Sequence, residues 1–120
     1  MLKGSCHCGG TKIEVSTAPT SVTSCNCTFC FKRGALWAYY EPAQVKLIAD
    51  EHGAKYQRPG RDIAHHHCAV CGCSTWSDSA RWVEGKPHPT QRRTLVNARL
   101  FDDFDLAAVP LHHIDGRNLW

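Results

Sequence analysis

The sequence has no long apolar run. None of its segments approaches the roughly 18 consecutive apolar residues that a membrane-spanning helix needs. The first ten residues, MLKGSCHCGG, hold no apolar stretch that could act as a secretory signal. We therefore expect a protein of the reducing cytoplasm. Its 120 residues favour a single domain over residues 1–120.

Dense positive charge is also missing. The formal net charge is +3, and the nearest approach to a basic tract is Lys86, Arg92 and Arg93, spread among prolines. Proteins that bind nucleic acid usually carry a basic patch or stripe. The sequence therefore disfavours a nucleic-acid-binding module.

Helical patterns are scarce, and only residues 28–33 (TFCFKR) and 102–109 (DDFDLAAV) are expected to form short helical turns. Segments rich in alternating or aromatic residues recur about every ten residues, which favours an all-β, mainly antiparallel domain. The two prolines and several charges of residues 84–93 (EGKPHPTQRR) predict a mobile loop. The expected strands are residues 11–16, 35–40, 45–48, 54–57, 63–67 and 94–100.

Cysteine, in contrast, is abundant. In a reducing compartment eight cysteines point to metal binding or catalysis rather than to disulfides. The CAVCG segment is a strong zinc signal, because its two-residue spacer lets both sulfurs face one metal and Gly72 permits a close turn. The CHC pair near the N-terminus could supply two further ligands. The cysteines form three groups: Cys6 and Cys8; Cys25, Cys27 and Cys30; Cys68, Cys71 and Cys73.

Two other interpretations of the cysteines are weaker. They could be small buried hydrophobic residues, but three spaced clusters in one short chain disfavour this. Cys68 and Cys71 could be a redox pair, but a thioredoxin-type motif precedes a helix in a βαβ unit and no such helix is expected here.

Four motifs occur in a characteristic order: GSCHCGG, CNCTFC, HCAVCG and VNARLFDDFDL. Together they resemble the glutathione-dependent formaldehyde-activating enzyme family, which also includes centromere protein V. The resemblance spans nearly the whole chain. It implies a β-tent fold of stacked antiparallel sheets around a structural zinc. It also implies a second zinc near a cleft, where an adduct of glutathione and formaldehyde forms or is broken.

Carried over by position, the resemblance gives two sets of zinc ligands. The structural zinc takes Cys6, Cys8, Cys68 and Cys71, and the second, catalytic zinc takes Cys25, Cys27 and Cys30. The sequence departs from the family pattern at His67, where the family often has an aromatic residue. Cys73 is an additional cysteine that the ligand pattern does not require.

The two ligand sets suit different chemistry. A structural zinc site is closed by four protein ligands, whereas a catalytic site keeps one position open for water or substrate. Three thiolates with an open position suit a thiol substrate such as glutathione, whose thiolate is the nucleophile. We therefore expect a carbon–sulfur lyase, with Cys73 outside the second site.

Several other side chains are candidates for substrate contacts or for proton transfer. Lys32 and Arg33 follow Cys30 directly and could meet substrate carboxylates. Asn97 and Arg99 could do the same, but we expect them on the solvated face of a strand. For the histidines 65–67 we favour packing or hydrogen bonding beside the CAVCG segment that follows them. We expect the aromatic residues Trp37, Tyr39 and Tyr40 to belong to the core.

Three classes of function remain open. The first is a zinc-dependent lyase acting on a thiol adduct. The second is a non-catalytic zinc module with both sites closed. The third is a chromatin-associated module, which the centromere relative suggests. A zinc ion held by four thiolates forms a site with a net charge of about −2, and one held by three thiolates a site of about −1. Added to the formal charge of +3, the two sites would leave the zinc-loaded chain nearly neutral. That balance disfavours the third class.

Overall fold

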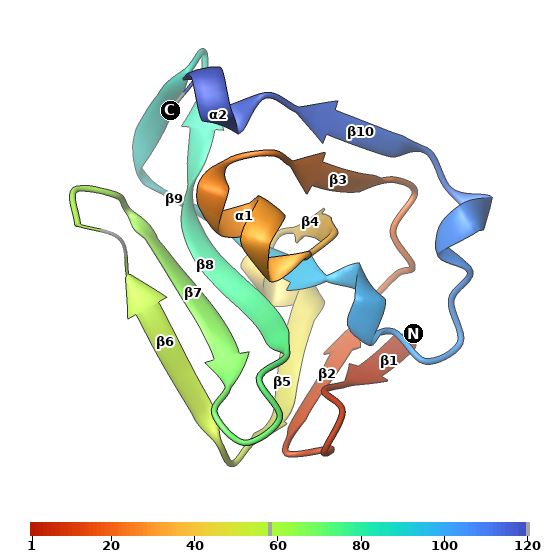
Figure 1. Cartoon of the computed structure of the whole chain (residues 1–120). Helices are drawn as coiled ribbons and strands as arrows, with labels where there is room; N and C mark the ends of the chain where they lie inside the picture. Colours follow the sequence, from red (N-terminus) through yellow and green to blue (C-terminus); the bar gives the residue numbers. More distant parts are fainter. Residues whose placement is uncertain (58, 120) are drawn as a thin grey trace.

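The computed structural model describes residues 1–57 and 59–119 and consists mainly of strands (Figure 1). No helix in this part of the chain has the length and apolar character required to cross a membrane. The strands are β1 (Leu2–Ser5), β2 (Thr11–Val15), β3 (Val22–Cys25), β4 (Trp37–Tyr40), β5 (Val45–Asp50), β6 (Gly53–Gln57), β7 (Ile63–Cys68), β8 (Ser74–Val83), β9 (Lys86–Asn97) and β10 (Leu111–Ile114). The helices are α1 (Thr28–Arg33) and α2 (Gly116–Leu119), with the 3₁₀ turns η1 (Pro42–Gln44), η2 (Ala98–Leu100) and η3 (Leu106–Ala108).

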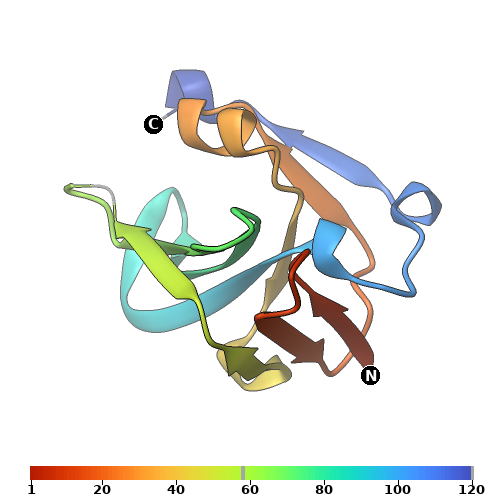
Figure 2. The same ribbon diagram turned by 60° about the horizontal axis from the view of Figure 1, so that its bottom comes forward.

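The strands form two sheets. The smaller sheet has the order β1-β2-β5, and the larger has the order β10-β3-β4-β9-β8-β7-β6. Strand β10 pairs in parallel with β3, and the other strand pairs described are antiparallel. Figure 2 shows the larger sheet curving beneath α1. The expected all-β, mainly antiparallel, β-tent-like fold with short helical turns is therefore confirmed.

The main core lies between the two sheets. Alternation along each strand sends every second side chain to this side, and the chain places apolar residues there. Ile13 and Val15 of β2 meet Ala38 of β4 and Val96 of β9, and all four are almost completely buried. Burial of such side chains is the main stabilising contribution to the fold.

The opposite face of the larger sheet lies towards α1, and we call it the α1-side face. Cross-strand pairs fix its members, because directly paired residues point to the same side. Phe29 of α1 stacks on His65 and Tyr56 of this face. Its residues include Thr23, Cys25, Trp37, Tyr39, Tyr56, Ile63, His65, Ser77, Ser79, Arg93, Leu95 and Asn97.

The predicted loop over residues 84–93 is wrong. Only Glu84 and Gly85 form the turn, with φ values of 52° and 76°, and Lys86 already begins β9. Positive φ at both central residues suits a tight hairpin between antiparallel strands. Pro87 pairs opposite Trp82 at the far end of β9, beyond the part that pairs with β4. A missing backbone N–H is tolerated there because none of the strands described pairs with that edge of β9.

The strand expected over residues 94–100 begins earlier and ends earlier than predicted. It ends at Asn97, whose side-chain oxygen accepts a hydrogen bond from the Arg99 backbone N–H at 3.2 Å and caps the turn η2. The helix over residues 28–33 is confirmed as α1. The helical turn expected within residues 102–109 is confirmed as the shorter η3.

Candidate metal centres

The first cysteine cluster joins two distant turns. Cys6 and Cys8 follow β1, and Cys68 and Cys71 lie where β7 turns towards β8. Their four sulfur atoms all lie within 4.8 Å of one another. The Sγ atoms of Cys8 and Cys68 are 3.6 Å apart, and those of Cys6 and Cys8 are 3.7 Å apart. Four thiolates around one zinc at about 2.3 Å would be about 3.8 Å apart, so this donor set fits a tetrahedral metal ion.

Backbone groups in both turns point at these sulfurs. The Thr11 N–H donates to Cys6 Sγ at 3.3 Å, and the Cys71 N–H donates to Cys68 Sγ at 3.5 Å. The N–H groups of Cys73 and Cys8 lower the pKa of the Cys71 thiol to about 5. Gly72 makes the turn possible with a φ of 81°, a conformation that disfavours side chains. The turns therefore favour the thiolate form, which binds metal, at Cys71 and ease ionisation of Cys6. The pKa of Cys8 is instead raised to about 11, because the neighbouring thiols and burial outweigh the hydrogen bond from the Gly10 N–H.

The second cysteine cluster lies where β3 ends and α1 begins. The sulfurs of Cys25, Cys27 and Cys30 lie within 4.8 Å of one another, and the three residues are 5% to 9% exposed. Cys27 is the N-cap of α1, and its sulfur accepts a hydrogen bond from the Cys30 N–H at 3.4 Å. The Cys27 N–H in turn donates to Cys25 Sγ at 3.4 Å. Three sulfurs arranged in this way fit a metal ion that keeps one further coordination position for a ligand other than these cysteines.

The loop between these sulfurs is held by the C-terminal segment. Ile114 of β10 pairs with Cys25 in parallel register. Asn26, which separates Cys25 from Cys27, donates from its side-chain amide to Asp115 at 3.0 Å and accepts from the Arg117 N–H at 2.9 Å. The second cluster thus depends on residues far away in the sequence.

Burial and hydrogen bonding set the charge state of these thiols. Burial raises the pKa of Cys30, although the Trp37 indole N–H donates to its sulfur at 3.4 Å. Burial also acts against ionisation of Cys27, but hydrogen bonds from the Cys30 N–H and from neighbouring thiols lower its pKa overall. The surroundings of Cys27 therefore ease ionisation of its thiol, whereas those of Cys30 oppose it. The Trp37 contact was not foreseen from the sequence, because it depends on strand pairing.

Cys73 belongs to neither cluster. Its sulfur is not among the two groups of convergent metal-ligating side chains found in residues 1–57 and 59–119. The side chain instead packs, partly buried, against the main core. Its backbone oxygen accepts a hydrogen bond from the Cys68 N–H at 3.0 Å, which helps to close the turn between β7 and β8.

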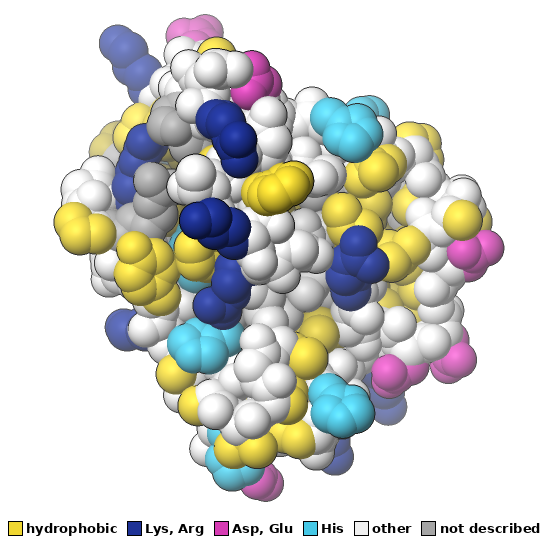
Figure 3. Space-filling view, in the orientation of Figure 1, with side chains coloured by type: hydrophobic (Ala, Val, Ile, Leu, Met, Phe, Trp, Pro, Cys, Tyr) yellow, Lys and Arg dark blue, Asp and Glu magenta, His cyan; other side chains and the backbone are white. Residues whose placement is uncertain are grey.

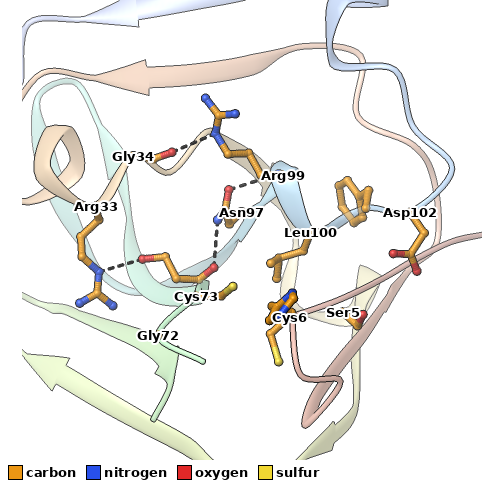
Figure 4. Close-up of a pocket in the computed structure, with 13 residues that line it drawn as sticks. Ser5, Cys6, Arg33, Gly34, Gly72, Cys73, Asn97, Arg99, Leu100 and Asp102 are labelled. Carbon is orange, nitrogen blue, oxygen red and sulfur yellow. Dashed lines mark hydrogen bonds between the residues drawn. The ribbon is translucent and has the colours of Figure 1, made fainter. Parts of the chain in front are cut away.

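A cavity of about 620 Å³ lies beside the first cluster (Figure 4). Cys6 and Cys73 line it together with Arg33, Asn97 and Arg99, and the three cysteines of the second cluster do not. The Arg33 Nε donates to Ser74 Oγ at 3.0 Å, and the Arg99 Nε donates to the Gly34 carbonyl at 3.0 Å. Both arginines have exposed side chains. Arg33 and Arg99, which the sequence offered as candidates for contacts with substrate carboxylates, thus lie at this cavity.

Asn97 differs from its expected place on a solvated face. It is buried, its amide donates to the Ser74 carbonyl at 2.9 Å, and its oxygen accepts from the Leu36 N–H at 3.3 Å. These bonds hold three segments together. Lys32 is exposed in the last turn of α1, as expected of a cation near Cys30.

Two histidines of β7, His65 and His66, pack as predicted. The His65 Nδ1 and Ser77 Oγ are 2.8 Å apart, and the His65 ring stacks on Phe29 with centroids 3.9 Å apart. His66 stacks on Trp76 at 3.8 Å. A shift in strand register between His65 and His67 interrupts the regular alternation of this strand.

The aromatic residues of β4 divide between the two faces of the sheet. Trp37 and Tyr40 are buried as expected, at 2% and 6% exposure. The prediction is wrong for Tyr39, which is 38% exposed. Its ring lies 4.2 Å from the guanidinium carbon of Arg93, a contact that sequence reasoning did not identify.

Positive charge gathers on the surface near α1. Figure 3 shows Lys and Arg side chains grouped on this face, with acidic side chains mainly towards its margin. Lys32 and Arg33 belong to α1, and the Arg117 guanidinium lies 5.7 Å from the ring of the exposed Phe31. A small anion approaching the second cluster would meet a favourable field.

Comparison with known proteins adds three findings. A family model described as glutathione-dependent formaldehyde-activating enzyme matches residues 1–114. A Halomonas elongata protein named "Putative glutathione-dependent formaldehyde-activating enzyme" is 30% identical over an alignment of 101 residues, and the match covers 70% of this chain and 60% of that protein. This chain thus spans less than two thirds of that relative's length. The crystal structure of a Rhodobacter sphaeroides protein superimposes with a TM-score of 0.71 at 27% identity and covers 92% of this chain and 99% of its own.

Proposed function

The chain belongs to the glutathione-dependent formaldehyde-activating enzyme family, and on that premise we propose that it is a zinc-dependent carbon–sulfur lyase. Its substrate would be a thiol adduct of formaldehyde, S-hydroxymethylglutathione in the first instance. Cys6, Cys8, Cys68 and Cys71 would hold a structural zinc. The catalytic zinc would be held by the cysteines of the second cluster, Cys25, Cys27 and Cys30.

The observation that carries this proposal is the difference between the two clusters. One has four convergent sulfurs and the other has three. Within residues 1–57 and 59–119, no fourth cysteine, histidine or carboxylate joins the three. A site with three protein ligands and one open position is the usual composition of a catalytic zinc site. Bound there, zinc would act as a Lewis acid that favours the thiolate form of a substrate sulfur.

The protein side chains around the second cluster have two further tasks. The Trp37 indole N–H holds Cys30 Sγ in place, and Leu95 and Phe29 pack against the cluster and limit water. Exclusion of water strengthens electrostatic interactions within such a site. The cations Lys32 and Arg33 would attract the negatively charged thiol towards it.

The proposed reaction is an addition and its reverse. The substrate thiol loses its proton, and its sulfur donates an electron pair to the formaldehyde carbon. A carbon–sulfur bond forms while the carbon–oxygen π pair moves to oxygen, which takes up a proton. The product is a hydroxymethyl thioether. In reverse, the hydroxyl group loses its proton, the carbonyl forms again and the sulfur leaves as a thiolate. No oxidant or reductant is needed.

The eight cysteines are free thiols, and the proposal therefore assumes a reducing compartment such as the cytoplasm. One observation favours an alternative, a non-catalytic zinc module. The second cluster is 5% to 9% exposed, and the cavity of about 620 Å³ is lined by other residues. In that alternative a fourth ligand would close the second site, and no thiol substrate would enter.

Exchange NMR tests the lyase. Zinc-loaded protein should speed exchange between free formaldehyde and its glutathione adduct well above the spontaneous background. Cys25→Ser, Cys27→Ser and Cys30→Ser should each reduce that acceleration at least about a hundredfold, since each removes one of the three sulfurs. Exchange at the rate of buffer, with glutathione and with other small thiols, would remove the lyase assignment and favour the non-catalytic module.

Cys73→Ser is the matched control for these variants. It changes the same chemical group in the same fold but lies outside both clusters. We expect it to keep most of the activity and about two zinc ions per chain by elemental analysis. Loss of the second zinc in Cys73→Ser would instead identify Cys73 as the fourth ligand. One zinc or none in wild-type protein made with ample zinc would contradict the two-site proposal.

A further inference from the structure

Arg93 of β9 combines partial burial with an unused donor. Its Nε is buried and has no hydrogen-bond partner among residues 1–57 and 59–119. The guanidinium lies over the Tyr39 ring at 4.2 Å. A buried polar group without a partner is costly. Such a donor is rare in a folded protein, and it has a clear use if a ligand supplies the acceptor.

No negative charge within residues 1–57 and 59–119 offsets Arg93. It takes part in none of the salt bridges found there, whereas its neighbour Arg92 pairs with Asp62 at 2.7 Å and with Asp78 at 3.2 Å. Arg81, whose positive charge also acts on Arg93, is itself paired with Glu41. The guanidinium of Arg93 is therefore an uncompensated charge in a partly desolvated position, where a carboxylate would be bound strongly.

The position of Arg93 relates it to the second cysteine cluster. Strand register places Arg93, Tyr39 and Cys25 on the α1-side face. Burial raises the pKa of the Tyr39 phenol most. The Arg93 guanidinium and a hydrogen bond with Thr23 act against that shift, and charges on Cys25 and Cys30 add to it. Tyr39 thus lies within electrostatic reach of both the cluster and the arginine. A ligand that spans Tyr39 would meet sulfur ligands at one end and a guanidinium at the other.

We propose that Arg93 is the carboxylate-binding residue for the thiol substrate, and that it selects acidic thiols over neutral ones. This inference rests on the proposed function, since it takes the second cluster as the place where the substrate sulfur binds. A guanidinium recognises a carboxylate through two parallel N–H donors. The Tyr39 ring keeps that fork in a fixed orientation, which reduces the entropy lost on binding.

The other arginines near α1 suit this task less well. The Nε groups of Arg33 and Arg99 already donate to Ser74 and to the Gly34 carbonyl. Both line the cavity beside Cys6, which the second cluster does not border. A carboxylate bound there would belong to a ligand in that cavity rather than to a thiol at the second cluster.

The binding test uses S-methylglutathione, whose blocked sulfur cannot react, and zinc-loaded protein. Calorimetry should show that Arg93→Gln binds this ligand roughly tenfold to a hundredfold more weakly than wild type. Arg92→Gln is the matched control, because it removes the same charge from the next position of β9, where the side chain pairs with Asp62 and Asp78. Arg92→Gln should bind as tightly as wild type.

A second ligand separates the carboxylate from the rest of the molecule. The diethyl ester of S-methylglutathione should bind wild-type protein and Arg93→Gln equally, because the interaction tested is then absent from both. In wild-type protein, the ¹⁵N–¹H signal of the Arg93 Nε should also shift on addition of S-methylglutathione. That measurement needs no variant and therefore does not depend on whether Arg93→Gln folds.

The outcomes also distinguish this inference from the lyase proposal. In exchange assays, the ratio of the rate with glutathione to that with 2-mercaptoethanol should fall at least tenfold in Arg93→Gln. Wild-type protein that binds S-methylglutathione through Arg93 but does not speed exchange would leave this inference standing and remove the lyase. Equal binding by Arg93→Gln and wild type, an unshifted Arg93 signal at saturating ligand, or weakened binding in Arg99→Gln alone would overturn it.

Discussion

Replacing Gly4 with alanine should destabilise the protein. Gly4 lies in β1 and forms an isolated bridge with Phe101. A Cβ atom added at Gly4 would lie 2.6 Å from the carbonyl oxygen of Leu100, 2.8 Å from its carbonyl carbon and 3.1 Å from the Cα atom of Phe101. All three are backbone atoms, so no side-chain rotation can relieve the contact. Either β1 or the segment of η2 has to move by several tenths of an ångström.

The cost can be estimated from this geometry. Forcing one extra carbon into a close-packed interior usually costs about 1–3 kcal/mol. For a domain of this size, each kcal/mol lowers Tm by about 4 °C. Gly4→Ala should therefore melt about 4–12 °C below wild type when zinc-loaded protein is followed by circular dichroism. Because β1 leads directly to Cys6, the shift should also loosen the first cluster and increase the rate at which a chelator removes its metal.

Lys3→Ala is the matched comparison. Lys3 neighbours Gly4 on β1, its side chain is 74% exposed, and its amine is 3.8 Å from a carboxylate oxygen of Glu14. Exposed ion pairs contribute little, so Lys3→Ala should melt within about 2 °C of wild type. If Gly4→Ala also melts within that range, β1 is not held against Leu100 as described, and the reasoning from the close contact fails.

Two further predictions concern the clusters and one concerns pH. Cys68→Ser should unfold or aggregate, because it breaks a metal site worth on the order of 10 kcal/mol. Cys27→Ser should stay folded by circular dichroism, since serine also caps helices, but it should lose the second zinc. If Cys27→Ser and Cys68→Ser unfold to the same extent, both sites are structural. Burial raises the pKa of Tyr40 to about 12 from 10.0. The unfolded chain therefore ionises first, and stability should fall as pH rises from about 10 to 12. In urea melts, Tyr40→Phe should lose less unfolding free energy between about pH 10 and 12 than wild type does. An equal loss in the two proteins would contradict this assignment to Tyr40.

Sequence patterns predicted the features that depend on short spacings. The alternation around Ile13 and Val15 predicted β2 almost to the residue, because one buried face imposes a period of two. The spacing of the cysteines predicted which turns carry sulfur, and the structure brings those sulfurs together in groups of four and three. Whether the groups bind zinc in the roles assigned to them stays a prediction.

Features that depend on a partner strand could not be predicted in this way. Residues 86–93 contain prolines and charges, yet they form part of β9 because β8 pairs with them. The polar Asn97 is buried because three neighbouring segments need its hydrogen bonds. Arg93 and Tyr39 are 54 positions apart in the sequence, and their contact follows only from the register of β4 against β9. Register is a tertiary property, and no local pattern around either residue encodes it.

The parallel pairing of β10 with β3 has a consequence for synthesis on the ribosome. The first cluster has all its sulfurs once residue 71 has been made, so metal can close it early. The three sulfurs of the second cluster are made earlier still, but the loop that holds them takes its backbone partners from Ile114 and Arg117. A nascent chain would therefore carry reactive, poorly anchored thiols through most of its elongation. Any metal they collect in that period would be bound loosely and open to exchange, and the final set of ligand positions would form only after the last strand has docked.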